Sequence, residues 1–124
     1  MSAPAVQRRE YVRVMSARPV LVYRGRDGRS VSSYTVDVSG GGMMLAGPDA
    51  LQQGEQISFR LTIAQGDPPI EGWARVVRGD RAGRRCVAFT TIGDLDRRRL
   101  VRFVFERQRM ERRRGLELED GRAG

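Results

Sequence analysis

Apolar and polar residues alternate along much of the chain, with the period of two expected of a β-strand that buries one face. A polar-to-apolar alternation of this kind runs from residue 33 to residue 38, at Tyr34, Val36 and Val38. The clearest case is residues 57–63, where every odd position is apolar: Ile57, Phe59, Leu61 and Ile63. Such segments are typical of antiparallel strands that face a core on one side and solvent on the other.

Segments rich in glycine, proline and aspartate separate the apolar stretches and predict turns. The triple glycine Gly40 to Gly42 is the most pronounced of these breaks. Between the breaks, the pattern predicts six strands, at residues 20–23, 33–38, 43–46, 57–63, 70–78 and 84–92. Six short strands without intervening helices favour a closed antiparallel barrel over a βαβ sheet.

The periodicity changes after residue 93. Apolar residues now recur at helical spacing among arginines, and Asp94 and Asp96 place negative charge where a helix begins. We therefore expect an all-β fold, a six-stranded antiparallel β-barrel with a C-terminal α-helix from Asp94 to about Arg114. Gly115 is the expected end of that helix.

The two ends of the chain lack a sustained apolar pattern. Residues 1–17 contain a basic cluster at 7–13, and residues 115–124 offer only two leucines for burial. With 124 residues, one domain with one modest core is expected. We expect a flexible N-terminal arm at 1–17, the barrel and helix at 18–114, and a disordered tail at 115–124.

The composition excludes several kinds of chemistry. The chain carries 23 basic and 15 acidic residues, a net charge of +8, and every basic residue is arginine. Without lysine there is no phosphate-binding P-loop and no Schiff-base nucleophile. Without histidine, the usual general base and zinc ligand are missing. We therefore expect no catalytic residue, no metal site and no cofactor, and a protein that is not an enzyme.

The location of the protein is predicted from its apolar runs and its cysteine content. No apolar run is long enough for a transmembrane helix or a secretory signal, and arginines already occur at positions 8, 9 and 13. Cys86 is the only cysteine, so an internal disulfide is excluded and a reducing compartment is favoured. We expect a cytoplasmic protein that does not insert into a membrane.

Two short motifs carry the candidate binding chemistry. Arg9 and Arg13 form the pattern RxxxR, and Asp37, Ser39 and Gly42 form the pattern DxSxxG. A spacing of four keeps both guanidinium groups on one side of either a strand or a helix, so both can reach one ligand. Arginine binds phosphates with a planar fork and pairs with the O6/N7 edge of guanine.

The second motif complements the first. The carboxylate of Asp37 can accept hydrogen bonds from a guanine N–H edge, and the hydroxyl of Ser39 can donate or accept one. Gly42 lacks a Cβ, so we expect it to adopt a positive φ and to let the backbone approach a ligand closely. A solvated basic tail is the alternative reading of Arg8, Arg9 and Arg13, and a simple strand turn is the alternative reading of the glycines.

In this order and in a six-strand context, the two motifs resemble the signature of the PilZ family, the bacterial receptor domain for cyclic di-GMP. The resemblance covers roughly residues 7–112. It implies that Arg9, Arg13, Asp37, Ser39 and Gly42 bind cyclic di-GMP. It also implies a role for Arg8, because in PilZ proteins the residue before RxxxR influences whether one ligand or a stacked pair is bound. An arginine there resembles the pair-binding arrangement.

The resemblance implies a sensor or adaptor. Cyclic di-GMP would link a mobile arm to the barrel rim, and a downstream protein partner, which the sequence does not identify, would recognise the new surface. A nucleic-acid-binding barrel is the alternative, suggested by the isoelectric point of 11.2 and the arginine-rich helix. Only 6% of residues are aromatic, which makes nucleic acid an unlikely partner. A PilZ-like adaptor that has lost ligand binding is a third possibility, against which the intact motifs argue.

Overall fold

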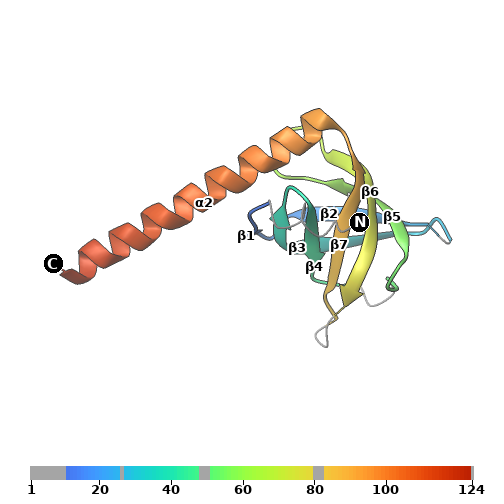
Figure 1. Ribbon diagram of the computed structural model, residues 1–124, viewed down its shortest axis with the longest axis horizontal. Coiled ribbons are helices and arrows are strands. Elements are labelled where there is room, and N and C mark those ends of the chain that lie inside the picture. Colours follow the sequence, from blue (N-terminus) through green and yellow to red (C-terminus); the bar gives the residue numbers. More distant parts are fainter. Residues whose placement is uncertain (1–10, 26, 48–50, 80–82, 124) are drawn as a thin grey trace, which may run out of the picture.

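The computed structural model describes residues 11–25, 27–47, 51–79 and 83–123. It contains seven strands followed by one long helix (Figure 1). Their bounds are β1 (Val14–Met15), β2 (Pro19–Arg24), β3 (Ser30–Ser39), β4 (Gly42–Leu45), β5 (Gln56–Leu61), β6 (Ile70–Gly79), β7 (Arg85–Ile92) and α2 (Asp94–Ala123). All six predicted strands are present, within a few residues of their expected ends.

The strands form a closed antiparallel barrel. Six of them follow the order β3-β2-β5-β6-β7-β4, and β4 pairs back onto β3 to complete the ring. The predicted six-stranded barrel with a C-terminal helix is therefore confirmed. The description all-β is loose, because a helix of 30 residues follows the barrel and a seventh short strand, β1, is added to β3.

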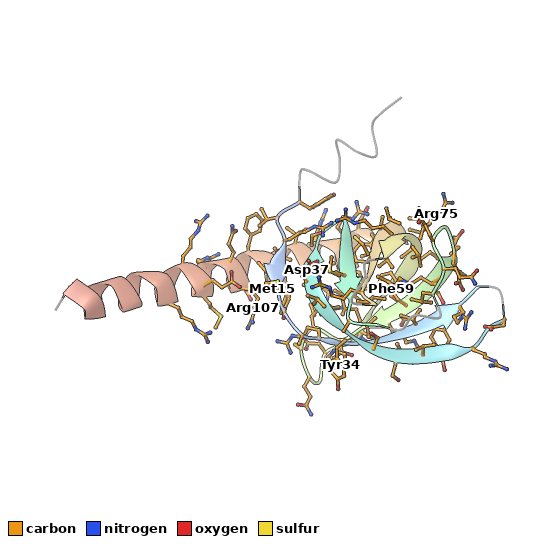
Figure 2. All side chains as sticks on the ribbon, turned by 90° about the horizontal axis from the view of Figure 1, so that it is seen from below. Met15, Tyr34, Asp37, Phe59, Arg75 and Arg107 are labelled. Carbon is orange, nitrogen blue, oxygen red and sulfur yellow. The ribbon has the colours of Figure 1, made fainter. Side chains whose placement is uncertain are left out.

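The barrel interior is filled by the alternating residues that the sequence pattern identified. Ile57, Phe59 and Leu61 of β5 are at most 1% exposed. Phe59 points into the barrel and stacks on Phe89 with ring centroids 5.0 Å apart, whereas Tyr34 and Arg75 lie on the outside (Figure 2). Removal of this apolar surface from water is the main force that holds the strands together.

The first half of α2 packs on the barrel and the second half extends away from it (Figure 1). Leu100 and Val104, one helical turn apart, are at most 3% exposed and belong to the barrel core. Within the described ranges, no helix is long and apolar enough to cross a lipid bilayer.

The expected end of the helix is wrong. The structure continues α2 through Gly115 to Ala123, beyond the expected end near Arg114. A glycine inside a helix costs only about 1 kcal/mol relative to alanine. The residues that follow it, Leu116 to Glu119, are good helix formers, so one glycine does not break the helix.

The C-terminal part of the expected arm belongs to the barrel. Val14 is 3% exposed and pairs with Val38, while Met15 pairs with Asp37 (Figure 2). The buried Thr35 hydroxyl strengthens this attachment, because it donates to the carbonyl of Ser16 and accepts from the N–H of Arg18. A strand of two residues is too short to show a period of two, so the sequence pattern missed it.

We predict that Thr35→Val destabilises the protein by about 1 to 3 kcal/mol, because the carbonyl of Ser16 and the N–H of Arg18 lose a buried partner. Urea denaturation measures this difference, and amide hydrogen exchange at residues 14–18 should accelerate. Thr91→Val, at an exposed position of β7, is the control and should leave both measurements unchanged. Equal stability of the two variants would contradict the role given to the Thr35 hydroxyl.

Candidate ligand-binding site

The turn between β3 and β4 is organised by the hydroxyl of Ser39. It accepts hydrogen bonds from the N–H groups of Gly41 and Gly42, both at 3.2 Å, and donates to the carbonyl of Gly42 at 3.3 Å. Ser39 is only 4% exposed. In this conformation the hydroxyl is engaged in shaping the turn, the role that serine commonly has in tight turns.

Gly42 is required by the close approach of β7. A Cβ at this position would overlap with the carbonyl oxygen of Val87, which belongs to the neighbouring backbone and cannot move aside. The expected positive φ at Gly42 is wrong, since the described glycines with positive φ are Gly28, Gly54, Gly66 and Gly83. The missing side chain serves the contact between two strands rather than a special backbone conformation.

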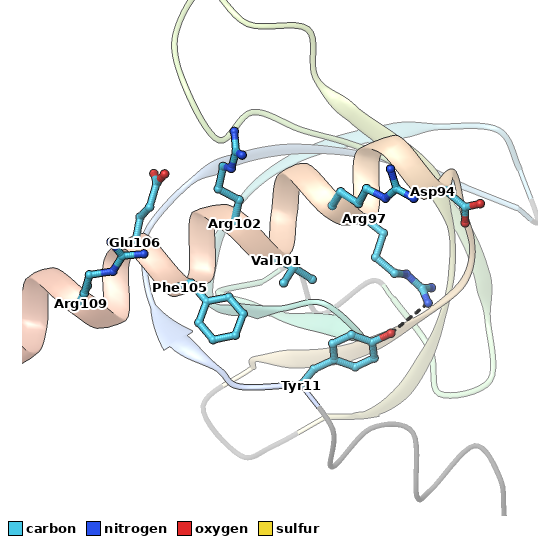
Figure 3. Close-up of a pocket in the computed structure, with 9 residues that line it drawn as sticks. Tyr11, Asp94, Arg97, Val101, Arg102, Phe105, Glu106 and Arg109 are labelled. Carbon is cyan, nitrogen blue, oxygen red and sulfur yellow. Dashed lines mark hydrogen bonds between the residues drawn. The ribbon is translucent and has the colours of Figure 1, made fainter.

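Tyr11, which lies inside the RxxxR motif, packs directly onto this turn. A Cβ on Gly40 would overlap with the ring of Tyr11 and lie 2.9 Å from a methyl group of Val101 on α2. Arg97 of α2 donates a hydrogen bond of 3.2 Å to the hydroxyl of Tyr11, and its guanidinium lies 5.7 Å from the centre of the ring (Figure 3). The N-terminal segment, the turn and the helix therefore meet at Gly40.

Arg13, the described arginine of RxxxR, lies beside Asp37 of DxSxxG. Nη1 of Arg13 lies 3.7 Å from Oδ1 of Asp37, a consequence of the register that pairs Met15 with Asp37. The Arg13 side chain is 44% exposed and that of Asp37 is 15% exposed. The same Oδ1 is buried and accepts no hydrogen bond from the described residues. At 3.7 Å the two atoms are too far apart for a hydrogen bond, and water reaches the half-exposed Arg13 side chain, so the buried Oδ1 still lacks a hydrogen-bond donor that a ligand could supply.

Two hollows of very different size flank the segment from Tyr11 to Arg13. The first, beside Arg13, is bounded by the turn and by β6 and β7, and its volume is about 10 Å³, far too small for a nucleotide. The second lies between Tyr11 and α2 and has a volume of about 770 Å³. A dinucleotide that contacts Arg13 and Asp37 must therefore lie on the surface or displace the segment that carries Arg13.

Four of the six predicted site residues surround this turn: Arg13, Asp37, Ser39 and Gly42. Arg8 and Arg9 lie outside the described residues. Ligand contact at all six stays a prediction. Sequence reasoning missed Tyr11 and Arg97. Two signals were visible in the sequence: an aromatic residue, Tyr11, lies inside RxxxR, and a glycine, Gly40, directly follows the serine of DxSxxG.

A family model described as the PilZ domain matches residues 7–106. The chain belongs to the PilZ domain family. The match includes both motifs and the whole barrel, and it confirms the family that the residues resembled. No curated protein matches this PilZ chain.

Solved structures share the fold. The PilZ domain of Escherichia coli YcgR with c-di-GMP has a TM-score of 0.64 and 21% identity, covering 88% of this chain and 98% of that one. The structure of Bacillus subtilis MotI/DgrA, an inhibitor of motility, has a TM-score of 0.69 and 23% identity, covering 82% of this chain and 51% of that one. A longer YcgR chain in complex with c-di-GMP has a TM-score of 0.72 and 21% identity, covering 90% of this chain and 50% of that one. The chain thus spans about half of MotI and of the longer YcgR.

We predict that Gly40→Ala displaces Tyr11 from the turn without unfolding the barrel, because the added Cβ overlaps with a side chain near the start of the described chain. Amide exchange at residues 11–13 should accelerate roughly tenfold, as expected when a docked segment opens locally. Gly47→Ala is the matched control, since a Cβ there meets nothing within 4 Å and should change nothing. Unchanged exchange in Gly40→Ala would show that Tyr11 is not docked in solution.

Proposed function

We propose that this protein binds cyclic di-GMP at the rim of its barrel and acts as a ligand-dependent adaptor for another protein. The observation that carries the proposal is that Arg13, the second arginine of RxxxR, lies 3.7 Å from Asp37, the first residue of DxSxxG. Had the two motifs lain on opposite sides of the barrel, no single ligand could have used both. The c-di-GMP present in the structurally similar YcgR PilZ domain supports the same ligand here.

The chemistry of the two groups fits a guanine dinucleotide. A carboxylate such as that of Asp37 accepts hydrogen bonds from the N–H groups of guanine, and the guanidinium of Arg13 binds a phosphate or the O6/N7 edge of the base. Charge-assisted hydrogen bonds of this kind are about twice as strong as neutral ones. Because the two residues form no hydrogen bond with each other at 3.7 Å, a ligand that donates to Asp37 and accepts from Arg13 can replace their ion pair.

The attachment of β1 to β3 determines which part of the N-terminal segment can move when a ligand binds. Residues 14–16 are held by pairing with β3 and by Thr35, so movement of the N-terminal segment is restricted to the residues before Val14. Those residues include Tyr11, whose contacts with Gly40 and Arg97 connect the segment to α2. Ligand binding at Arg13 would therefore change a surface that the segment, the turn and α2 form together, and a protein partner would recognise that surface.

A nucleic-acid-binding barrel is the second candidate. Exposed arginines along α2, among them Arg98, Arg102 and Arg109, give that helix a basic surface suited to a phosphate backbone. Such binding would require no contribution from Asp37, whose charge repels phosphate. The absence of catalytic activity and a cytoplasmic location stay predictions.

We predict that Arg13→Ala and Asp37→Ala each weaken cyclic di-GMP binding at least tenfold in isothermal titration calorimetry, since a hydrogen bond to a charged group contributes about 1.5 to 3 kcal/mol. Arg29 is exposed and directly precedes β3, at the end of that strand opposite Asp37, so Arg29→Ala should bind like the wild type. GMP and GTP should not displace the ligand. If cyclic di-GMP gives no signal while an oligonucleotide binds with steep salt dependence, the second candidate replaces the first.

A separate prediction concerns Arg8, which lies outside the described residues. If its guanidinium helps to hold a stacked pair of ligands, Arg8→Leu should lower the number of cyclic di-GMP molecules bound per chain from two to one. The stoichiometry measured by calorimetric titration tests this, with Arg29→Leu as control. An unchanged ratio would remove Arg8 from the site.

A further inference from the structure

A groove of about 770 Å³ lies between Tyr11 and α2. Its floor is formed by residues of α2 between Asp94 and Arg109, and Tyr11 forms one wall (Figure 3). A volume of this size lies within the range of small-molecule sites in proteins, about 300 to 1,000 Å³. Tyr11 lies two residues from Arg13, so the groove adjoins the rim where the two motifs meet.

The lining of the groove is divided into two parallel rows along α2. One row, spaced by four residues, consists of Arg97, Val101 and Phe105, whose side chains point toward Tyr11 (Figure 3). Phe105 is 51% exposed although it is a large apolar residue. Together with Tyr11 it offers aromatic faces to an occupant, and stacking on such a face contributes about 1 to 3 kcal/mol per base.

The second row is charged. Arg98 and Arg102 lie one turn apart beside the row formed by Arg97, Val101 and Phe105, and Arg109 continues the basic lining at the far end. Carboxylates occur at two places in the same groove, at Asp94 and Glu106. Guanidinium groups fit phosphates, aromatic faces fit a purine ring, and carboxylates accept the N–H groups of guanine while repelling a continuous phosphate backbone. This combination favours a compact guanine nucleotide over a nucleic-acid strand.

We infer that the groove is a second compartment of the ligand site, in which α2 holds one guanine and the adjoining phosphate of cyclic di-GMP. Tyr11 and Phe105 contact the base, and Arg98 and Arg102 bind the phosphate. The other half of the ligand lies on the surface at Arg13 and Asp37, because the hollow of about 10 Å³ beside Arg13 is too small to enclose it. This inference rests on the proposed function and adds α2 to the ligand site.

Calorimetric titration of cyclic di-GMP into the full chain tests the groove with two variants. Phe105→Ala and the double variant Arg98→Ala/Arg102→Ala should each weaken binding by about tenfold or more. Phe105→Tyr retains an aromatic face and should bind nearly as well as the wild type. The control is Arg112→Ala/Arg113→Ala, which removes the same charge from exposed positions of α2 outside the groove and should leave affinity within twofold.

The outcomes separate the two proposals. If the groove variants bind like the wild type while Arg13→Ala loses binding, the proposed function stands and the groove is not part of the ligand site. If Arg98→Ala/Arg102→Ala and Arg112→Ala/Arg113→Ala weaken cyclic di-GMP binding equally, the loss of affinity comes from the change in net charge. That result would also overturn the inference. If the wild type does not bind cyclic di-GMP, both proposals fail. Thermal denaturation of each variant confirms that lost binding does not reflect an unfolded chain.

Discussion

The antiparallel pairing of β1 with β3 is the constraint on which the site depends. It spans only two residue pairs, yet the register that places Met15 opposite Asp37 also brings Arg13 within 3.7 Å of that carboxylate. In a strand the side-chain period is two, so a slip of one residue would turn Arg13 to the opposite face and bury a charge. Val14 in the core and Thr35 beneath the segment oppose such a slip.

The residues of the second motif serve the fold in this conformation. Ser39 shapes the turn with its hydroxyl, and Gly42 allows β7 to approach. Gly40, which lies between them, has no side chain and so allows both Tyr11 and α2 to pack closely against the turn. A turn this tightly determined holds Asp37 in a constant position relative to the N-terminal segment, and a preorganised site loses less entropy when it binds. The same residues can therefore be needed for stability and for ligand recognition.

The barrel could be predicted from the sequence because strands that bury one face must alternate, as residues 57–61 do. The short strand β1 and the C-terminal half of α2 could not. A strand of two residues, such as β1, is too short to show an alternation of apolar and polar positions. A glycine such as Gly115 normally signals the end of a helix, but its cost of about 1 kcal/mol to helix stability does not force the helix to end there. The motifs identified the rim from residue types alone. The contacts of Tyr11 with Gly40 and Arg97 depend on segments far apart in the chain, which local patterns do not relate.

Only the N-terminal half of α2 packs on the barrel, so a tilt of the helix there would displace its far end. The helix is anchored near Leu100 and Val104, and 19 residues follow Val104 up to Ala123. At a rise of about 1.5 Å per residue, this portion reaches roughly 28 Å beyond Val104. A tilt of about 10° at the base would then move the tip by about 5 Å, a distance close to one helical turn. A small rearrangement around Gly40 that tilted α2 would thus produce a larger displacement at the far end of the helix.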